Sequence, residues 1–329
     1  MAVLVSGGAG YIGSHMAHAL CDAGERVVVV DDLSTGQRAA VPGAATFIQA
    51  DVSDQAGMAD ILRQHQVTAI AHFAARIVVP DSVADPLGYY LANTVKTRAL
   101  LETAVAGGIG HFIFSSTAAV YGDAGDGAVG EDAPRAPVSP YGRSKLMSEW
   151  MLQDAAGAHG LKYAALRYFN VAGADPQGRT GQSTPNATHL IKVACQTALG
   201  KRDRLQVFGV DYPTADGSCI RDYIHVTDLA QAHVQALEHL RGGGDSFIAN
   251  CGYGRGLSVL EVIRAVERIT GRSLPVEIAP RRAGDPARIV ANTARIQNLL
   301  DWRPQHDSID EIVGSALAWE QRLTNSASG

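Results

Sequence analysis

Short apolar runs and amphipathic stretches alternate along the first third of the chain. Runs typical of buried strands occur at residues 3–5, 26–30, 46–48, 69–73 and 111–115. Between them, apolar positions recur at helical spacing over residues 14–23, 58–65 and 87–106. Strands and helices alternating at this spacing predict an α/β fold, a doubly wound, Rossmann-type parallel sheet with helices on both faces.

The second half of the chain has a less regular pattern. A polar, glycine-containing stretch at residues 176–185 predicts a loop, and helices are predicted over residues 188–199, 227–240, 258–270 and 309–323. We therefore expect a Rossmann domain over residues 1–170 and a smaller mixed α/β domain over residues 171–329. Some segments, about residues 207–227, are expected to cross back to the first domain.

Composition narrows the possible partners. The 329 residues are 46% hydrophobic and 19% charged, enough for one large or two medium domains, and the net charge of −5 gives no basic field for a nucleic acid. No apolar run approaches the roughly 18 residues of a membrane span, and we identify no signal peptide. The four cysteines are far apart, which favours reduced thiols in the cytoplasm over a disulfide framework or a metal site.

A glycine-rich loop, "GGAGYIG", spans residues 7–13 directly after the first predicted strand. Alone, this spacing is weak evidence and also fits a plain turn. Here the loop follows a strand and opens a helix, so that Gly7, Gly10 and Gly13 would let the backbone approach a pyrophosphate at the helix N-terminus. The context favours a dinucleotide site.

An acidic residue, Asp31, ends the second predicted strand 18 residues after Gly13. A carboxylate there can accept hydrogen bonds from a ribose and would repel a 2′-phosphate, which favours NAD over NADP. The alternative is that Asp31 only caps the strand. Asp51 follows the third strand and could reach the adenine edge, although a surface turn explains it nearly as well.

The stretch "SPYGRSK", residues 139–145, carries the candidate chemistry. Ser139 is a good N-cap and Pro140 a good first helical residue, so Tyr141 and Lys145 lie four apart on one helical face. A free tyrosine, with a pKa of about 10, is a poor base at neutral pH. A neighbouring ammonium would lower that pKa and let Tyr141 take a proton from a hydroxyl. A surface helix pair is the alternative.

A second candidate lies in "FIFSSTAAVYG", residues 112–122, where a strand ends at the carboxyl edge of the sheet. Ligands bind at that edge in folds of this class. Thr117 can therefore hydrogen-bond a reacting hydroxyl or carbonyl, or it can merely cap the strand.

Seven segments spread nearly end to end carry a family resemblance. They are "VLVSGGAGYIGSH", "HFAA", "FIFSSTAAVYG", "SPYGRSKLMSE", "RYFNVAGA", "FGVDYPTADGSCIRDYIHV" and "APRRAGDPA". Together they resemble the extended short-chain dehydrogenase/reductase family and, within it, the UDP-glucose 4-epimerases. The resemblance implies an enzyme that oxidises the sugar at C4 with NAD, turns a 4-keto intermediate and re-reduces it on its other face. Tyr141 would be the base, and NAD would stay bound throughout turnover.

The resemblance also assigns site residues. The catalytic residues would be Thr117, Tyr141 and Lys145, with no metal. Cofactor-binding residues would be Gly7, Gly10, Tyr11, Ile12, Gly13, Asp31, Asp51, Val52, Phe73, Ala74, Ala75, Asn93, Ser115, Tyr141, Lys145 and Tyr168. Substrate-binding residues would be Thr117, Tyr141, Phe169, Asn170, Val207, Phe208, Arg221, Arg282 and Asp285.

Specific roles follow for the substrate residues. Arg221 and Arg282 would hold the UDP diphosphate, a task suited to a planar, always-charged group. Asp285 would hold the uridine ribose, and Asn170 the diphosphate or the sugar. Relatives also imply a homodimer formed by the helix at residues 87–106 and the helix after Tyr141.

Three departures from the family pattern stand out. The catalytic hydroxyl is Thr117, where many relatives have serine. Ile77 replaces a lysine that often contacts NAD, which predicts weaker retention of the cofactor. The uridine loop reads "PNAT", residues 185–188, in place of "PNNL", and leaves the contacts of the loop at residues 185–190 open.

Rival functions differ in the residues that they need. Sugar-nucleotide dehydratases use an Asp-Glu pair just after the catalytic threonine, and UDP-glucuronate decarboxylases a glutamate in this stretch; here Ala118 and Ala119 follow. A keto-reductase would favour NADPH, which Asp31 disfavours. Epimerisation of UDP-GlcNAc, a UDP-pentose or a UDP-uronic acid stays open, since packing around Ile289 sets the room for the sugar. A non-catalytic NAD-sensing module would not need Tyr141, Lys145 and the arginines together.

Overall fold

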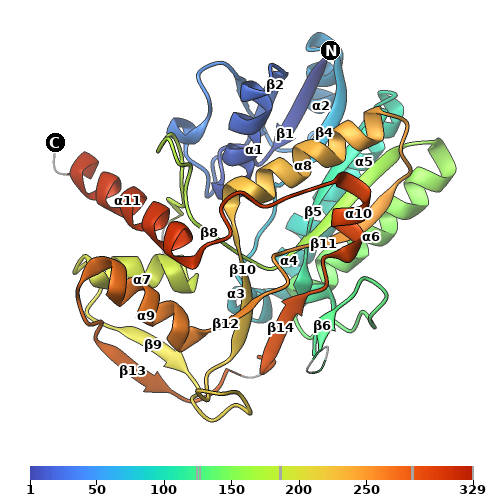
Figure 1. The fold of residues 1–329 in the computed structure, drawn as a ribbon. Coiled ribbons are helices and arrows are strands. Elements are labelled where there is room, and N and C mark those ends of the chain that lie inside the picture. Colours follow the sequence, from blue (N-terminus) through green and yellow to red (C-terminus); the bar gives the residue numbers. More distant parts are fainter. Residues whose placement is uncertain (124, 126, 185–186, 283–284, 328–329) are drawn as a thin grey trace.

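The first strand, β1 (Ala2–Ser6), lies inside a seven-stranded sheet in which all neighbouring strands are parallel (Figure 1). The computed structural model describes residues 1–329 apart from residues 124, 126, 185–186, 283–284 and 328–329. The sheet order is β11-β7-β5-β4-β1-β2-β3. The other strands are β2 (Arg26–Asp31), β3 (Thr46–Gln49), β4 (Val67–His72), β5 (His111–Thr117), β7 (Lys162–Tyr168) and β11 (Phe247–Cys251).

The direction of strand order reverses between β1 and β4, because the chain places β2 and β3 on one side of β1 and β4 on the other. Folds of this kind bind ligands at such a switch point, outside the carboxyl ends of the strands. The predicted doubly wound parallel sheet is therefore confirmed, and its switch point lies where the glycine-rich loop leaves β1.

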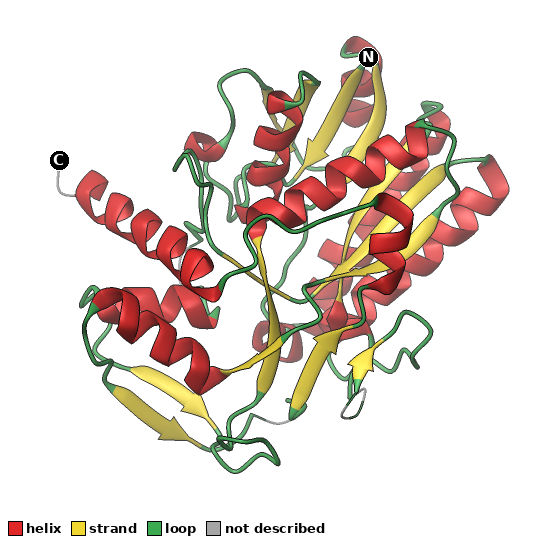
Figure 2. Cartoon of the chain, in the orientation of Figure 1, coloured by secondary structure: helices red, strands yellow, loops and turns green. Residues whose placement is uncertain are grey.

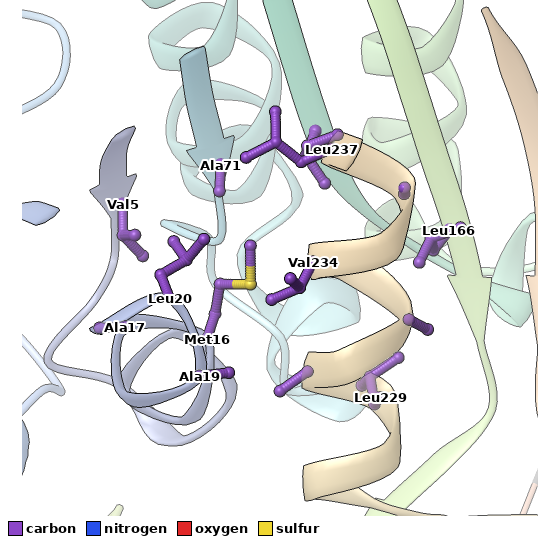
Figure 3. Packing of buried hydrophobic residues seen from close by; sticks show 14 of the residues in the cluster. Val5, Met16, Ala17, Ala19, Leu20, Ala71, Leu166, Leu229, Val234 and Leu237 are labelled. Atoms are coloured by element: carbon purple, nitrogen blue, oxygen red, sulfur yellow. The ribbon is translucent and has the colours of Figure 1, made fainter. Parts of the chain in front are cut away.

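Helices cover both faces of the sheet. One face carries α1 (Tyr11–Asp22) and α8 (Val226–Arg241), and the other carries α2 (Gln55–Gln64), α5 (Lys96–Ala106) and α6 (Pro140–His159). Figure 3 shows the first layer, where Met16 and Leu20 of α1 lie between the strands and Val234 of α8. These apolar side chains are almost completely removed from water, so the hydrophobic effect holds the two helices on the sheet.

The helix predicted over residues 87–106 is divided. Its path is formed by α4 (Pro86–Tyr90), a π-helical turn over residues 91–95 and α5. Asn93 lies in that turn, and its carbonyl accepts hydrogen bonds from the Thr97 and Ser148 hydroxyls. Its side chain bonds the backbone N–H and carbonyl of Arg76 at 2.8 and 2.9 Å. These tertiary bonds favour the wider turn, which helical periodicity does not reveal.

The second half of the chain builds smaller layers (Figure 2). One sheet contains β8 (Asn170–Ala172), β10 (Ile220–His225), β12 (Gly256–Ser258), β14 (Arg288–Ala291) and β6 (Ala128–Val129), and β9 (Leu205–Phe208) pairs with β13 (Val276–Ala279). Three helices, α7 (Leu190–Ala198), α9 (Val259–Thr270) and α11 (Ile309–Ala327), enclose a separate apolar cluster. The shorter elements are α3 (Val79–Ala84), α10 (Ala294–Leu300), η1 (Arg38–Ala40) and η3 (Ala118–Val120).

The two parts of the chain exchange elements. Helix α8 packs against α1, and β11 pairs with β7, so residues late in the sequence complete the large sheet. In the other direction, Val129 of β6 pairs with Ala291 of β14. Within the part of the chain that the structure describes, no helix is long and apolar enough to cross a membrane.

Candidate active site

Helix α6 brings its first turns against the end of β5. Ser139 caps the helix by accepting a hydrogen bond from the Gly142 N–H at 3.1 Å, and Pro140 occupies its first position, as predicted. A Cβ on Gly142 would lie 2.4 Å from the carbonyl oxygen of Ala119, so only glycine permits this approach. The approach buries both Tyr141 and Lys145 beside the carboxyl edge of the sheet.

The hydroxyl of Tyr141 is hydrogen-bonded to the side chain of Thr117. Burial raises the pKa of Tyr141 to about 12, and the bond to Thr117 opposes that rise. Thr117 ends β5, and its hydroxyl oxygen also accepts a bond from the Ala119 N–H at 3.1 Å. The structure therefore brings the predicted base and the predicted hydroxyl together, and Thr117 also acts as the cap that the sequence left as an alternative.

Lys145 is directed at the strand rather than at the tyrosine. Its Nζ donates to the carbonyl of Ser115 at 2.9 Å and lies 5.0 Å from the centre of the Phe114 ring. Burial lowers the pKa of Lys145 to about 7, while the charge of Glu149 opposes this. The spacing of the two residues in the sequence predicts that Lys145 lowers the pKa of Tyr141. In this geometry burial governs that pKa instead, because the ammonium points to a backbone carbonyl.

The glycine-rich loop forms a close-fitting cradle at the end of β1. Gly7 has φ +70°, and a Cβ there would lie 2.5 Å from the backbone nitrogen of Ala74. A Cβ on Gly13 would lie 2.2 Å from the carbonyl oxygen of Gly7. Gly10 is the N-cap of α1 and offers no side chain to the first helical N–H groups. Such an N-terminus fits the pyrophosphate of a dinucleotide, and Tyr11 and Ile12 form the first turn behind it.

Asp31 borders the cradle at the end of β2. Its carboxylate accepts hydrogen bonds from the Ala9 N–H at 2.9 Å and the Leu33 N–H at 2.8 Å, and burial raises its pKa. A carboxylate has about four acceptor sites, so these two bonds orient Asp31 and leave capacity for ribose hydroxyls. The capping role left open by the sequence and the cofactor role are thus compatible.

The remaining cofactor candidates surround the same edge of the sheet. The Asp51 carboxylate forms an ion pair with Lys96 at 2.5 Å and accepts a hydrogen bond from the Ser53 N–H at 2.9 Å. Val52 beside it is buried. Phe73, Ala74 and Ala75 follow β4. Ile77, the departure from the family lysine, is 45% exposed. The Ser115 hydroxyl is hydrogen-bonded to the Tyr168 hydroxyl, which joins the ends of β5 and β7.

The substrate candidates form two pairs in the second half of the chain. Arg221 of β10 lies 3.5 Å from the Asp285 carboxylate, and the Arg282 guanidinium lies 3.7 Å from the centre of the Phe208 ring. Val207, next to Phe208, is buried. Asn170 begins β8 and pairs with Tyr223 of β10. The predicted uridine residues Pro185 and Asn186 lie outside the described residues.

Ile289 connects the two groups of candidates. It neighbours Arg221 in the ladder between β10 and β14, and it packs against the apolar cluster that contains Ala118, together with Phe169. Arg221 and Thr117, the residue before Ala118, therefore lie on either side of one small apolar contact.

A model of the NAD dependent epimerase/dehydratase family matches residues 3–252. The chain belongs to this family. It is 56% identical to the UDP-glucose 4-epimerase of Azospirillum brasilense over 324 residues, which are 98% of this chain and 93% of that protein. The family resemblance expected from the sequence is thereby confirmed.

Solved structures of family members have the same fold. The UDP-glucose 4-epimerase from Brucella ovis in complex with NAD is 45% identical with a TM-score of 0.94, over 96% of this chain and 97% of that one. The enzyme from Stenotrophomonas maltophila, with bound NAD and formylated UDP-arabinopyranose, is 39% identical with a TM-score of 0.96, over 99% of both chains.

A buried polar network in this epimerase/dehydratase family member was not anticipated. Glu149 and Arg167 form an ion pair behind the site, and Arg167 also donates to the Tyr121 hydroxyl at 2.9 Å. Tyr121 in turn donates to the Asn250 side chain at 2.6 Å. One signal was present in the sequence, since Glu149 follows Lys145 by four residues on the same helical face.

Proposed function

We propose that the protein is an NAD-dependent UDP-glucose 4-epimerase that interconverts UDP-glucose and UDP-galactose through a 4-keto sugar that turns within the site. The observation that carries the proposal is the buried Tyr141–Thr117 hydrogen bond beside the glycine cradle. The 56% identity to a UDP-glucose 4-epimerase over nearly the whole chain supports the same reaction.

Three side chains carry the proton chemistry. When bound, NAD supplies the hydride acceptor and donor for C4 of the sugar. Tyr141 Oη takes the proton of the C4 hydroxyl during oxidation and returns it during reduction. Thr117, whose side chain is hydrogen-bonded to Tyr141, holds the C4 oxygen of the sugar or relays that proton. Because burial raises the tyrosine pKa to about 12 and Lys145 is directed at the Ser115 carbonyl, Tyr141 would need the positive charge of oxidised NAD in addition to Lys145 to act as a base at neutral pH.

The binding residues divide between the two parts of the chain. We assign NAD to residues 1–170, with Gly7, Gly10 and Gly13 at the pyrophosphate and Asp31 at a ribose. We assign the UDP-sugar to residues 171–329 with the returning segments. Arg221 and Arg282 suit the diphosphate and Asp285 the ribose of uridine. Arg221 donates from Nη1 to the carbonyls of Ile220 and Pro286, which orient it, while its contact with Asp285 is loose at 3.5 Å and Arg282 lies over the Phe208 ring.

An apolar stripe supports a homodimer. Leu87, Leu91 and Val95 recur every four residues and are 78%, 54% and 49% exposed, and Trp150 on the neighbouring α6 is 48% exposed. Exposed apolar surface of this extent marks an interaction site. We expect Leu91→Glu to convert a dimer into a monomer in analytical ultracentrifugation. A wild-type chain that sediments as a monomer would contradict the dimer.

The cysteines bear on the cellular compartment. All four are free thiols, and Cys195, Cys219 and Cys251 are buried. Reduced cysteines suit the cytoplasm, where we place the protein.

The function is tested by following UDP-glucose formation from UDP-galactose with purified protein and added NAD. We expect conversion by the wild type and a loss of about 10²- to 10⁴-fold in Tyr141→Phe. The matched control is Tyr163→Phe, which alters a tyrosine near the start of β7, away from the site, and should convert normally.

The opposite outcome is equally informative. If NAD binds but neither UDP-hexose reacts, the hexose assignment is wrong, and UDP-pentoses and UDP-uronic acids are the next substrates to test. If Tyr141→Phe keeps wild-type turnover, the tyrosine is not the base. If NAD binds without turnover of any UDP-sugar, the protein is a sensing module.

A further inference from the structure

A fully buried ion pair lies one helical turn beyond Lys145. The side chains of Glu149 in α6 and Arg167 in β7 are 0% and 1% exposed. Arg167 donates through Nε to Oε1 of Glu149 at 2.9 Å and through Nη2 to Oε2 at 2.6 Å. Ser116 of β5 donates its hydroxyl to Oε1 at 2.5 Å. The carboxylate therefore joins α6 to two adjacent strands.

Ser116 is the residue through which this carboxylate reaches the site. It stands between Ser115, whose carbonyl receives the Lys145 ammonium, and Thr117, whose side chain is bonded to Tyr141. A shift of Ser116 would move both neighbours, because they share its backbone. The hydrogen bond to Glu149 thus fixes the end of β5 against the helix that carries the other two catalytic candidates.

Arg167 is placed on the same rung of the sheet. It pairs with Ser116 in the ladder between β5 and β7, and the next residue is Tyr168. The hydroxyl of Tyr168 is bonded to that of Ser115. Glu149, which bonds both Ser116 and Arg167, and the Ser115–Tyr168 hydrogen bond therefore tie β5 to β7 beneath the site.

Folding stability alone does not account for burying two charges here. Replacing a buried ion pair with apolar residues of similar volume is often neutral or stabilising, because desolvation costs about as much as the attraction returns. The Glu149 carboxylate can act as the counterion of a neighbouring positive charge, which an apolar pair could not do.

Lys145 is that neighbouring charge. Its ammonium is buried, its direct polar contact among the described residues is a backbone carbonyl, and the charge of Glu149 acts on it from the same helix. On β4, burial lowers the pKa of His72 to about 3, so His72 is neutral near Lys145 at working pH. Arg167 faces Glu149, and Tyr141 is protonated at neutral pH. Among these groups, Glu149 is the anion.

We propose that Glu149 is a positioning residue for the Tyr141–Thr117–Lys145 group, tying α6 to the end of β5 through Ser116 and supplying the negative charge that balances the buried Lys145 ammonium. The assignment rests on the proposed epimerase function for its effect on turnover. Its effect on Lys145 is independent of that function.

The direct test follows the Lys145 side chain by nitrogen-15 NMR. The chain has five lysines, at positions 96, 145, 162, 192 and 201, so selective labelling gives few signals, and Lys145→Met identifies the one of interest. In Glu149→Gln, we expect the titration midpoint of Lys145 to fall by about one pH unit or more, because the balancing charge is gone. An unchanged midpoint overturns the charge role.

Ser116→Ala is the matched control because it removes the strand contact and keeps the carboxylate. Its Lys145 midpoint should match that of the wild type, while turnover of UDP-galactose falls roughly 10- to 100-fold, chiefly in kcat, because Thr117 is displaced. Turnover equal to that of the wild type overturns the positioning role.

Glu149→Gln leaves Arg167 buried without its partner and could fail to fold. The double variant Glu149→Met/Arg167→Met removes both charges and keeps an apolar filling, and its Lys145 midpoint should fall in the same direction but by less, because the Arg167 charge is gone as well. A double variant that folds and titrates like the wild type contradicts the proposal. If the wild type itself converts no UDP-sugar, the epimerase function fails, while the midpoints still decide the role of Glu149.

Discussion

The end of β5 and the arginine-bearing strands of the second half hold their polar groups in opposite ways. Tyr141, Thr117 and Lys145 are almost fully buried, and each is bonded to a neighbouring group of the same site or to the backbone. Arg221 is also buried and donates to the carbonyls of Ile220 and Pro286, but its ion pair with Asp285 is loose, at 3.5 Å, and that carboxylate is 36% exposed. The first region has the geometry of a preformed catalytic group, whereas the second holds charges whose partners a substrate can replace.

This difference predicts which kinetic parameter each region controls. Changes at the preformed group should lower kcat, because its contacts are needed in the transition state. Changes at the exchangeable charges should raise KM, because those charges bind the substrate in the ground and transition states alike.

After Tyr141→Phe, the largest effect is expected at Thr117. Thr117→Val removes the hydroxyl that bonds Tyr141 and keeps the shape of the side chain, so kcat should fall by about 10²- to 10³-fold with little change in KM. Thr117→Ser retains the hydroxyl and should keep most of the activity. Steady-state kinetics of both variants decide the matter, and a valine variant as active as the serine variant would remove Thr117 from the reaction.

The second region should respond through binding. Arg221→Met removes one charge-assisted partner of the diphosphate, worth about 1.5–3 kcal/mol, so KM for UDP-galactose should rise roughly 10- to 100-fold with kcat largely kept. Arg204→Met is the control, because Arg204 is 63% exposed and pairs with Glu277 in the same region. A fall in kcat alone for Arg221→Met would contradict the comparison.

A smaller, graded effect is expected from acid. Burial lowers the pKa of His72 to about 3 and that of His233 to about 4, from 6.5. Since the unfolded chain binds these protons at higher pH, each histidine stabilises the fold fully above pH 6.5, and this contribution is lost as the pH falls toward 4. The loss is about 1 kcal/mol per pH unit for each histidine.

Urea unfolding at pH 7.5, 6.0 and 5.0 measures that slope. His72→Asn should reduce it, because one of the buried histidines is gone. A free energy of unfolding that does not change between pH 7.5 and pH 5.0 would show that these side chains gain protons without unfolding.

Local patterns predicted the parts of the site that lie within one element. The cap at Ser139 and the four-residue spacing of Tyr141 and Lys145 are readable because a helix fixes both. The role of the glycine-rich loop could be predicted because the loop joins a strand to a helix. Periodicity likewise gave the alternating strands and helices of the large sheet.

Contacts between residues far apart in the sequence determine the features of the site that local patterns did not predict. The π-helical turn around Asn93 depends on Arg76 and Ser148, which are 17 and 55 residues away. The direction of the Lys145 ammonium depends on the carbonyl of Ser115, 30 residues earlier. The pairing of Glu149 with Arg167 needs α6 to lie across β7. No periodicity encodes these distances, so they appear only in the folded chain.

The central claim is that C4 of a UDP-hexose gives up and regains its hydrogen as a hydride, with NAD as the hydride carrier, while Tyr141 takes and returns the proton of the C4 hydroxyl. The most direct test uses UDP-galactose deuterated at C4, with NAD and wild-type protein, and mass spectrometry of the UDP-glucose formed. The account predicts that deuterium stays on C4 of the product and that Tyr141→Phe forms little product. Product that has lost its deuterium to water would contradict the account, because the enzyme would then remove C4 hydrogen as a proton.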